Sequence, residues 1–203
     1  MARPQSSDRN AKVAAIQKEA KRKDRSRLFT IWGALGLVLL LIVGAVGFAI
    51  ANRPTLDAVQ EYEDLGRDHL VEAVEYDQSP PPGGDHHPAW LNCGVYTEEV
   101  PQYHAVHSLE HGAVWLSYQP DLAADELETL QGLADQPYII LSPVADQTSP
   151  VVATAWGVQL EVDSADDQRL STFIGEYRQG PQTPEPGAAC TGGTAVDLVE
   201  AGK

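Results

Sequence analysis

An uncharged, apolar run from Leu28 to Ala51 constrains this 203-residue chain more than any other feature. About twenty consecutive apolar residues are enough for a helix to cross the hydrocarbon core of a bilayer. We therefore predict a transmembrane helix over residues 28–51. Ala49-Ile-Ala51 also has the form of a signal-peptidase site, but the apolar region of a signal peptide is shorter, which favours an uncleaved anchor over cleavage after Ala51.

The distribution of charge predicts how this helix is oriented. Residues 1–27 hold nine of the 14 Lys and Arg but three of the 29 Asp and Glu. Because positive flanking segments stay in the cytoplasm, we expect residues 1–27 to be a basic cytoplasmic tail and residues 52–203 to lie outside the plasma membrane. The strongly acidic outer part would repel a phosphate backbone, so we expect no nucleic-acid partner. The expected partners are the membrane and another protein of the cell envelope.

The outer part divides into three predicted segments. Apolar residues recur near helical spacing from Leu56 to Leu70, which predicts a helical stalk over residues 52–75, with His69 on its surface. The breaker cluster Ser79-Pro-Pro-Pro-Gly-Gly84 then marks the start of a folded domain over residues 76–191. The Gly-containing end, residues 192–203, is expected to be a flexible tail.

The folded domain mixes strands and helices. Short apolar runs predict strands, amphipathic stretches predict helices, and Gly157 separates two strands that can pair. This order is typical of an α+β domain. The strands are expected at residues 113–118, 138–141, 151–156 and 159–162, and the helices at residues 121–134 and 165–179.

The two cysteines, Cys93 and Cys190, both follow the predicted transmembrane helix. An even pair in an oxidising compartment favours a disulfide. In the alternative interpretation, Cys93 is a free thiolate that binds a metal.

The segment His107-Ser-Leu-Glu110-His111 carries the most chemistry. On a helix, positions i and i+4 share a face, so His107 and His111 can bind one metal ion, with Glu110 beside them as ligand, base or orienting partner. The letters also match the H-x-x-E-H pattern of some zinc peptidases. That enzyme would need a further acidic ligand, for which Glu161, Glu176 and Glu185 are all candidates, so a metallohydrolase is the less favoured hypothesis and no catalytic residue is assigned.

Five blocks in order make the chain similar to a bacterial family catalogued as domain of unknown function 3105, whose members are often actinobacterial membrane proteins with one N-terminal anchor. The resemblance covers residues 76–191 and implies a shared extracytoplasmic domain, without an established activity. It implies that His86, and not His87, is the histidine after the Gly-rich loop, and it argues against His104 as a ligand. The blocks are His86 with Pro88, Asn92–Tyr96, His107–Gly112, Thr154–Gly157 and Thr183–Cys190.

The functional hypothesis is a metal site formed by His86, His107, His111 and Glu110. Imidazole and carboxylate ligands suit zinc or copper. Met1 is the only methionine, so thioether ligation of Cu(I) is not expected. The alternative is a non-metal structural or protein-interaction module of the cell envelope, in which the same side chains form a buried hydrogen-bonded network.

Overall fold

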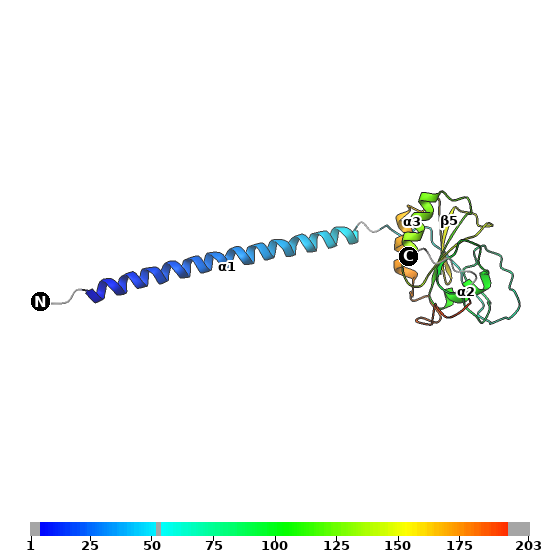
Figure 1. The fold of residues 1–203 in the computed structure, drawn as a ribbon, viewed down its shortest axis with the longest axis horizontal. Coiled ribbons are helices and arrows are strands. Elements are labelled where there is room, and N and C mark those ends of the chain that lie inside the picture. The colour runs from blue at the N-terminus through cyan, green and yellow to red at the C-terminus, as the bar shows by residue number, and fades with distance from the viewer. Residues whose placement is uncertain (1–4, 52–53, 195–203) are drawn as a thin grey trace. The chain divides into compact units, whose positions relative to one another are not determined.

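The computed structural model describes residues 5–51 and 54–194, and the chain divides into two units, the second beginning at Pro54. The first unit is one helix, α1 (Gln5–Ala51), blue in Figure 1. It continues the predicted transmembrane segment back through most of the basic tail. Its part Thr30–Ala51 has a mean hydropathy of 2.7 and exposed side chains. A helix of this length and composition could anchor the protein in a membrane or act as a signal sequence.

The second unit contains a mixed sheet of six strands in the order β1-β6-β5-β3-β4-β2. The central strand β3 pairs parallel with β4 and antiparallel with β5. Together with three helices this sheet confirms the predicted α+β class. The strands are β1 (Gln60–Glu61), β2 (Gly94–Val95), β3 (Val114–Tyr118), β4 (Ile139–Pro143), β5 (Val151–Ala155) and β6 (Val158–Val162).

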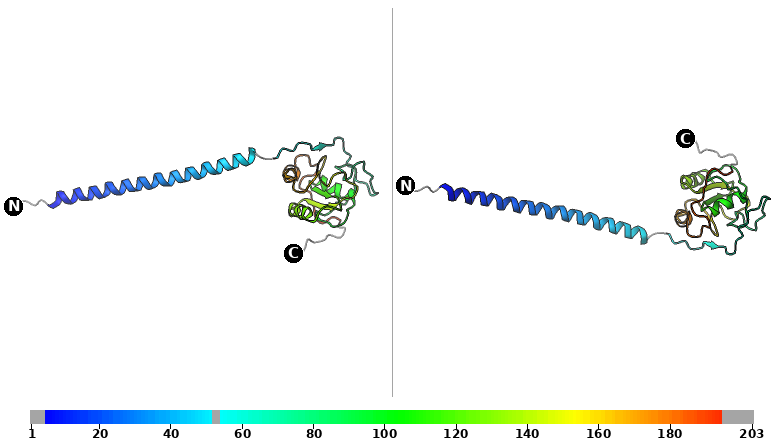
Figure 2. Two further views of the ribbon diagram at one scale, coloured as in Figure 1. Left: turned by 90° about the horizontal axis from the view of Figure 1, so that it is seen from above. Right: turned by 90° about the horizontal axis from the view of Figure 1, so that it is seen from below.

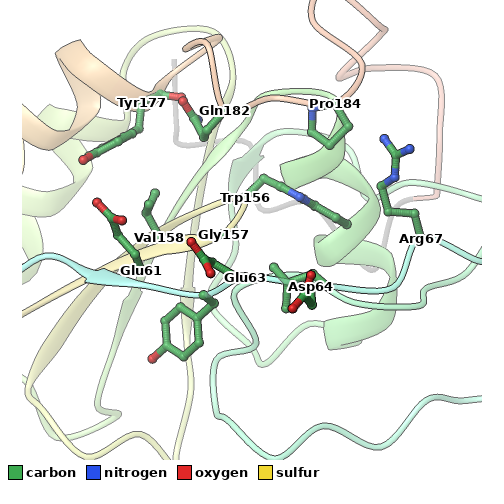
Figure 3. Close-up of a pocket in the computed structure, with 12 residues that line it drawn as sticks. Glu61, Glu63, Asp64, Arg67, Trp156, Gly157, Val158, Tyr177, Gln182 and Pro184 are labelled. Carbon is green, nitrogen blue, oxygen red and sulfur yellow. The ribbon is translucent and has the colours of Figure 1, made fainter.

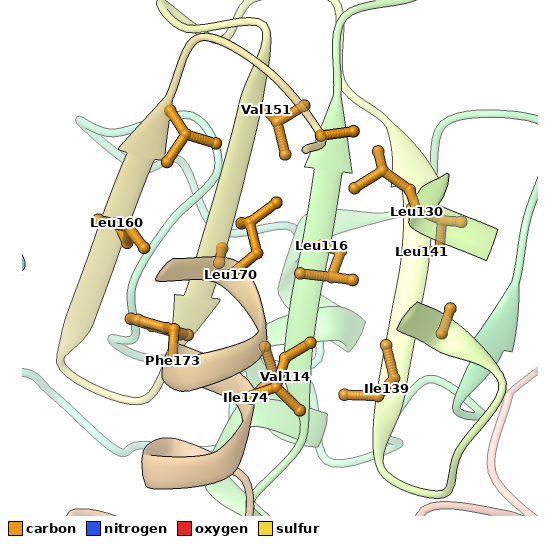
Figure 4. Close-up of a cluster of buried hydrophobic side chains, with 14 of the residues drawn as sticks. Val114, Leu116, Leu130, Ile139, Leu141, Val151, Leu160, Leu170, Phe173 and Ile174 are labelled. Carbon is orange, nitrogen blue, oxygen red and sulfur yellow. The ribbon is translucent and has the colours of Figure 1, made fainter. Parts of the chain in front are cut away.

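Alternating side chains of the sheet build two apolar layers, because successive residues of a strand point to opposite faces. Val114 and Leu116 of β3 pack with α3 (Ala124–Ala134) and α4 (Gln168–Tyr177). These two helices lie beside each other on one face in both views of Figure 2, and Figure 4 shows the side chains between them and the sheet. Trp115 belongs to the second cluster, on the other face, with α2 (Gln102–Glu110).

The hairpin of β5 and β6 confirms the pairing predicted from Gly157. Ala155 lies opposite Val158, so a two-residue turn joins the strands. Gly157 has a φ of 73°, in the left-handed region that favours glycine. A Cβ there would lie 3.3 Å from the carbonyl oxygen of Tyr62.

The predicted helical stalk is wrong, because the described residues from Pro54 to residue 75 form no helix. Leu56 and Val59 pack against the first core cluster, and β1 pairs with the edge strand β6. The apolar residues whose spacing suggested a helix thus belong to an extended segment that packs on the domain. Contacts with the rest of the fold override a weak helical preference here. The folded unit begins at Pro54 rather than at residue 76.

The start of the predicted flexible tail is hydrogen-bonded to the domain. Thr194 N donates to Trp90 O at 2.8 Å, and Thr194 O accepts from Asn92 N at 2.9 Å. Residues 195–203, the rest of that prediction, lie outside the described residues.

Candidate metal site

The H-x-x-E-H segment forms the end of helix α2 (Gln102–Glu110), on the opposite face of the sheet from α3 and α4. His111 is the C-terminal cap residue, and its backbone N donates to His107 O at 3.1 Å. The two imidazoles therefore lie one helical turn apart, as the spacing predicted. Both are buried, His107 at 5% and His111 at 4% exposure, so they face the interior of the domain.

His86 reaches this cluster from the loop that follows the proline-rich segment. Its backbone N donates to Asp68 O at 3.0 Å, and its backbone O accepts from Leu70 N at 2.8 Å. This parallel bridge places the ring of His69 edge-on to the ring of His86, with 4.8 Å between centroids. The extended segment that replaces the expected stalk thus brings a fourth imidazole to the cluster.

Three of the imidazoles are oriented by backbone carbonyl oxygens. A carbonyl oxygen only accepts hydrogen bonds, so each Nδ1 must carry the proton and donate it. The neutral ring then has a lone pair at Nε2, which is the atom available to a metal. The three bonds join Nδ1 of His86, His107 and His111 to the oxygens of Gly84, His87 and Ala189, at 2.7, 2.6 and 2.6 Å.

The Nε2 atoms of His107 and His86 each lie close to another hydrogen-bond acceptor. His107 Nε2 lies 2.9 Å from His111 Nε2, and His86 Nε2 lies 3.0 Å from Glu110 Oε2. With Nδ1 protonated in each neutral ring, both contacts bring two lone pairs together and place no hydrogen between them. Such an arrangement is unfavourable unless a proton or another cation lies between the two atoms.

Burial affects the protonation of His107 directly. The pKa of His107 is lowered to about 4, mainly because burial removes the ring from water; the neighbouring imidazoles of His111, His86 and His69 contribute to the lowering, and the hydrogen bond to His87 O opposes it. At neutral pH the His107 ring is therefore uncharged, and its Nε2 remains free to bind a cation.

Four groups can approach a single ion. One ligand atom from each of His69, His86, His107 and Glu110 lies within 4.8 Å of all the others, and this group could hold a metal ion. His111 adjoins it through the contact with His107. The structure therefore brings the four predicted residues together and adds His69, whose side chain is 44% exposed. The sequence placed His69 on a helix surface, and no local pattern pointed to its role.

A second carboxylate lies beside His111. Glu185 Oε2 is 3.7 Å from His111 Nε2, and Glu185 N donates to Glu110 O at 3.0 Å. The sequence offered Glu185 as one of three distant acidic candidates and could not choose among them. Glu161 is occupied elsewhere, because it accepts a hydrogen bond from Ser149 on the far side of the hairpin.

His87 and His104 form a separate pair. Their ring centroids lie 4.4 Å apart, His104 Nδ1 donates to Ala89 O at 2.5 Å, and His87 Nδ1 accepts from Ala89 N at 2.9 Å. Within the described part of the chain, neither ring belongs to the group of four. The backbone carbonyl of His87 is nevertheless part of the site, because it orients His107.

Cys93 and Cys190 are joined in a disulfide, with 5.3 Å between their Cα atoms. Cys93 is thus not a thiolate ligand. The bridge lies next to Ala189, whose carbonyl oxygen accepts the Nδ1 proton of His111. Cys93 N also donates to Cys190 O at 2.7 Å, so the bridge and this bond together attach the C-terminal loop beside the site.

An open cavity of about 580 Å³ lies near the cluster, and Figure 3 shows its lining. Trp156 lines this cavity, and its ring also stands edge-on to the ring of His86, with 5.8 Å between centroids. Acidic side chains surround the cavity at Glu61, Glu63 and Asp64, with Arg67 as the cation among its lining residues. The acidic wall would attract cations to this side of the domain.

Comparison with known proteins places the chain in a family. The model described as "Protein of unknown function (DUF3105)" matches residues 69–192. The matched region starts at His69 and contains every side chain of the cluster and both cysteines. Searches of the curated proteins and of the solved structures found no match. Because the matched region covers more than half of the 203 residues, this chain belongs to the DUF3105 family of proteins of unknown function.

Proposed function

We propose that this protein is a membrane-anchored, extracytoplasmic metal-binding protein that takes zinc or copper through His86, His107, His111 and Glu110. The observation that carries the proposal is the 2.9 Å contact between His107 Nε2 and His111 Nε2. In both rings Nδ1 donates its hydrogen to a carbonyl oxygen. The lone pairs of the two Nε2 atoms therefore face each other with no hydrogen between them.

The spacing of these two atoms suits a bound ion. Zinc binds imidazole nitrogens at about 2.0–2.1 Å, so two tetrahedral nitrogen ligands lie roughly 3.3 Å apart. The observed distance is 2.9 Å, and a small rotation of the rings would bring the two nitrogens to the spacing of zinc ligands. A purely structural network would instead turn one of the two Nδ1 atoms away from its carbonyl, because that change would provide the missing hydrogen.

The available ligands favour zinc or Cu(II) over Cu(I). Imidazole and carboxylate ligands suit the two divalent ions. Cys93 and Cys190 are paired, and the only methionine is Met1, so thiolate and thioether ligands are lacking at the cluster. Each orienting carbonyl also raises the basicity of its imidazole, as the outer partners of metal-binding histidines commonly do.

The proposed location follows from the apolar helix and the disulfide. The part Thr30–Ala51 of α1 is long enough to cross a bilayer, and the basic residues that precede it favour an N-terminus in the cytoplasm. A disulfide favours an oxidising compartment for the domain. We propose that the protein binds or supplies a metal close to the outer surface of the membrane.

The test uses the full chain, purified in mild detergent and stripped with a chelator. Zinc and Cu(II) are titrated separately into wild type, His107→Gln/His111→Gln and the control His104→Gln, which changes a histidine of the same helix outside the cluster. We expect tight binding by wild type and the control, and a loss of at least about tenfold in affinity in the double variant. Absence of zinc and copper binding by wild-type protein with a native circular dichroism spectrum would end the proposal.

A further inference from the structure

The candidate metal ligands at the cluster can be grouped into two sets, one around each carboxylate. In the first set, Glu110 Oε2 lies 3.0 Å from His86 Nε2 and 3.7 Å from His69 Nε2. Each set has two imidazoles and one carboxylate. The second set consists of His107, His111 and Glu185, with 2.9 Å between the two Nε2 atoms and 3.7 Å from His111 Nε2 to Glu185 Oε2.

We infer that the cluster binds two divalent ions side by side, one in each set. This inference rests on the metal binding proposed above and adds His69 and Glu185 as ligands. One tetrahedral ion takes four ligands, whereas six suitable side chains converge here. Two imidazoles with one carboxylate form a recognised three-ligand metal site that leaves a position for water.

The two sets adjoin closely enough for a pair of ions. One ring nitrogen of His107, from the second set, lies within 4.8 Å of the ligand atoms of His69, His86 and Glu110. Ions in two-metal sites are about 3.5–4 Å apart and share a bridging oxygen. This proximity places the two sets next to each other.

The outermost ligand of each set is held by the backbone of a buried one. His69 is flanked by the two hydrogen bonds that Asp68 and Leu70 make with His86, and Glu185 N donates to Glu110 O at 3.0 Å. His69 is 44% exposed and Glu185 is 52% exposed, whereas the other four side chains are buried. The site is therefore preformed at its base, and one solvent-facing ligand completes each half.

The acidic domain can offset the charge of a second ion. Each carboxylate neutralises half of one divalent charge, and the acidic domain offsets the remainder, since 26 of the 29 Asp and Glu but five of the 14 Lys and Arg follow residue 27. With one ion, either Glu110 or Glu185 would lie beside the imidazoles without a metal.

The experiment counts zinc in the full chain in detergent, by elemental analysis after equilibration with zinc and removal of free ion. We expect two zinc ions per wild-type chain, one in Glu185→Gln, one in His69→Gln and two in the control His104→Gln. One zinc ion per wild-type chain would overturn the inference and leave the proposed function standing. No bound zinc here, together with no bound Cu(II) in the titration described above, would overturn both.

Electron paramagnetic resonance of bound Cu(II) gives a second measurement, and a change in protein stability alone would not alter its result. Chains loaded with two equivalents of Cu(II) should show the dipolar broadening of two ions about 4 Å apart, and Glu185→Gln should show one isolated ion. An isolated-ion spectrum from the wild-type chain at both one and two equivalents would contradict the paired site.

Discussion

Removal of the Cys93–Cys190 disulfide tests how the C-terminal loop is held beside the histidines. The bridge connects residues 97 positions apart. In the folded state, the loop keeps other attachments when the bridge is cut: Cys93 N donates to Cys190 O at 2.7 Å, and Gly193 N donates to the side chain of Asn92 at 2.9 Å. Most of the effect should therefore come from the unfolded chain, which gains freedom.

The size of the effect follows from the length of the closed loop. The chain-entropy model assigns a loop of about 100 residues roughly 4.7 kcal/mol at 25 °C. Residual structure in the unfolded chain reduces the measured value, so we expect the free energy of unfolding to fall by about 3–4.5 kcal/mol. Zinc affinity should fall by less than the 10–100-fold that loss of an orienting partner costs, because the carbonyl of Ala189 is retained.

The assay is urea unfolding of the full chain in detergent, followed by tryptophan fluorescence, since Trp115 is fully buried. Wild type is compared with and without dithiothreitol, and Cys93→Ala/Cys190→Ala is the matched control on which the reductant should have no effect. A loss below about 1 kcal/mol in both reduced wild type and the variant would refute the entropic reasoning. Loss of zinc binding from a folded, reduced protein would show that the bridge itself positions His111.

Three further predictions concern stability. The pKa of His107 is lowered from the ordinary 6.5 to about 4, mainly by burial, so the unfolded chain binds more protons than the folded one between these pH values, and stability rises with pH. In denaturant titrations the metal-free protein should therefore lose on the order of 3 kcal/mol of stability from pH 7 to pH 4. His107→Gln should not show this loss. Phe173→Ala, in the fully buried core between α4 and the sheet, should cost about 3–5 kcal/mol in urea unfolding and leave zinc stoichiometry unchanged. Gly112→Ala should lower the free energy of unfolding by about 2–3 kcal/mol, because Gly112 has a φ of 95° and a Cβ would displace the Gln179 amide from His111 O. Gly132→Ala, at a position of α3 with open space around it, should raise the free energy of unfolding by about 0.5–1 kcal/mol. Equal effects of the two substitutions would refute this reasoning.

The elements that local pattern predicts are those whose partners are close in sequence. The β5–β6 hairpin needs only two apolar runs and Gly157, and α3 and α4 each present one apolar stripe to the sheet. The helix predicted for the segment from Pro54 is wrong because an apolar residue at every third position suits both a helix and an extended chain that contacts the domain at intervals. Pairing of β1 with β6, nearly a hundred residues later, decides between them, and no local signal encodes that pairing.

The candidate site shows the same limit at the level of side chains. The i, i+4 spacing of His107 and His111 predicts only that two rings share a face, an arrangement that many buried helices tolerate. What makes these rings suitable candidate ligands is the direction of their Nε2 atoms, and carbonyl oxygens from two loops set that direction. Glu185 illustrates this most clearly: of three candidate carboxylates, it lies beside His111 because its own backbone N donates to Glu110 O, across 75 positions of sequence. Ligand types can therefore be predicted from composition and spacing, but the grouping of ligands depends on loop docking, which only the folded chain contains.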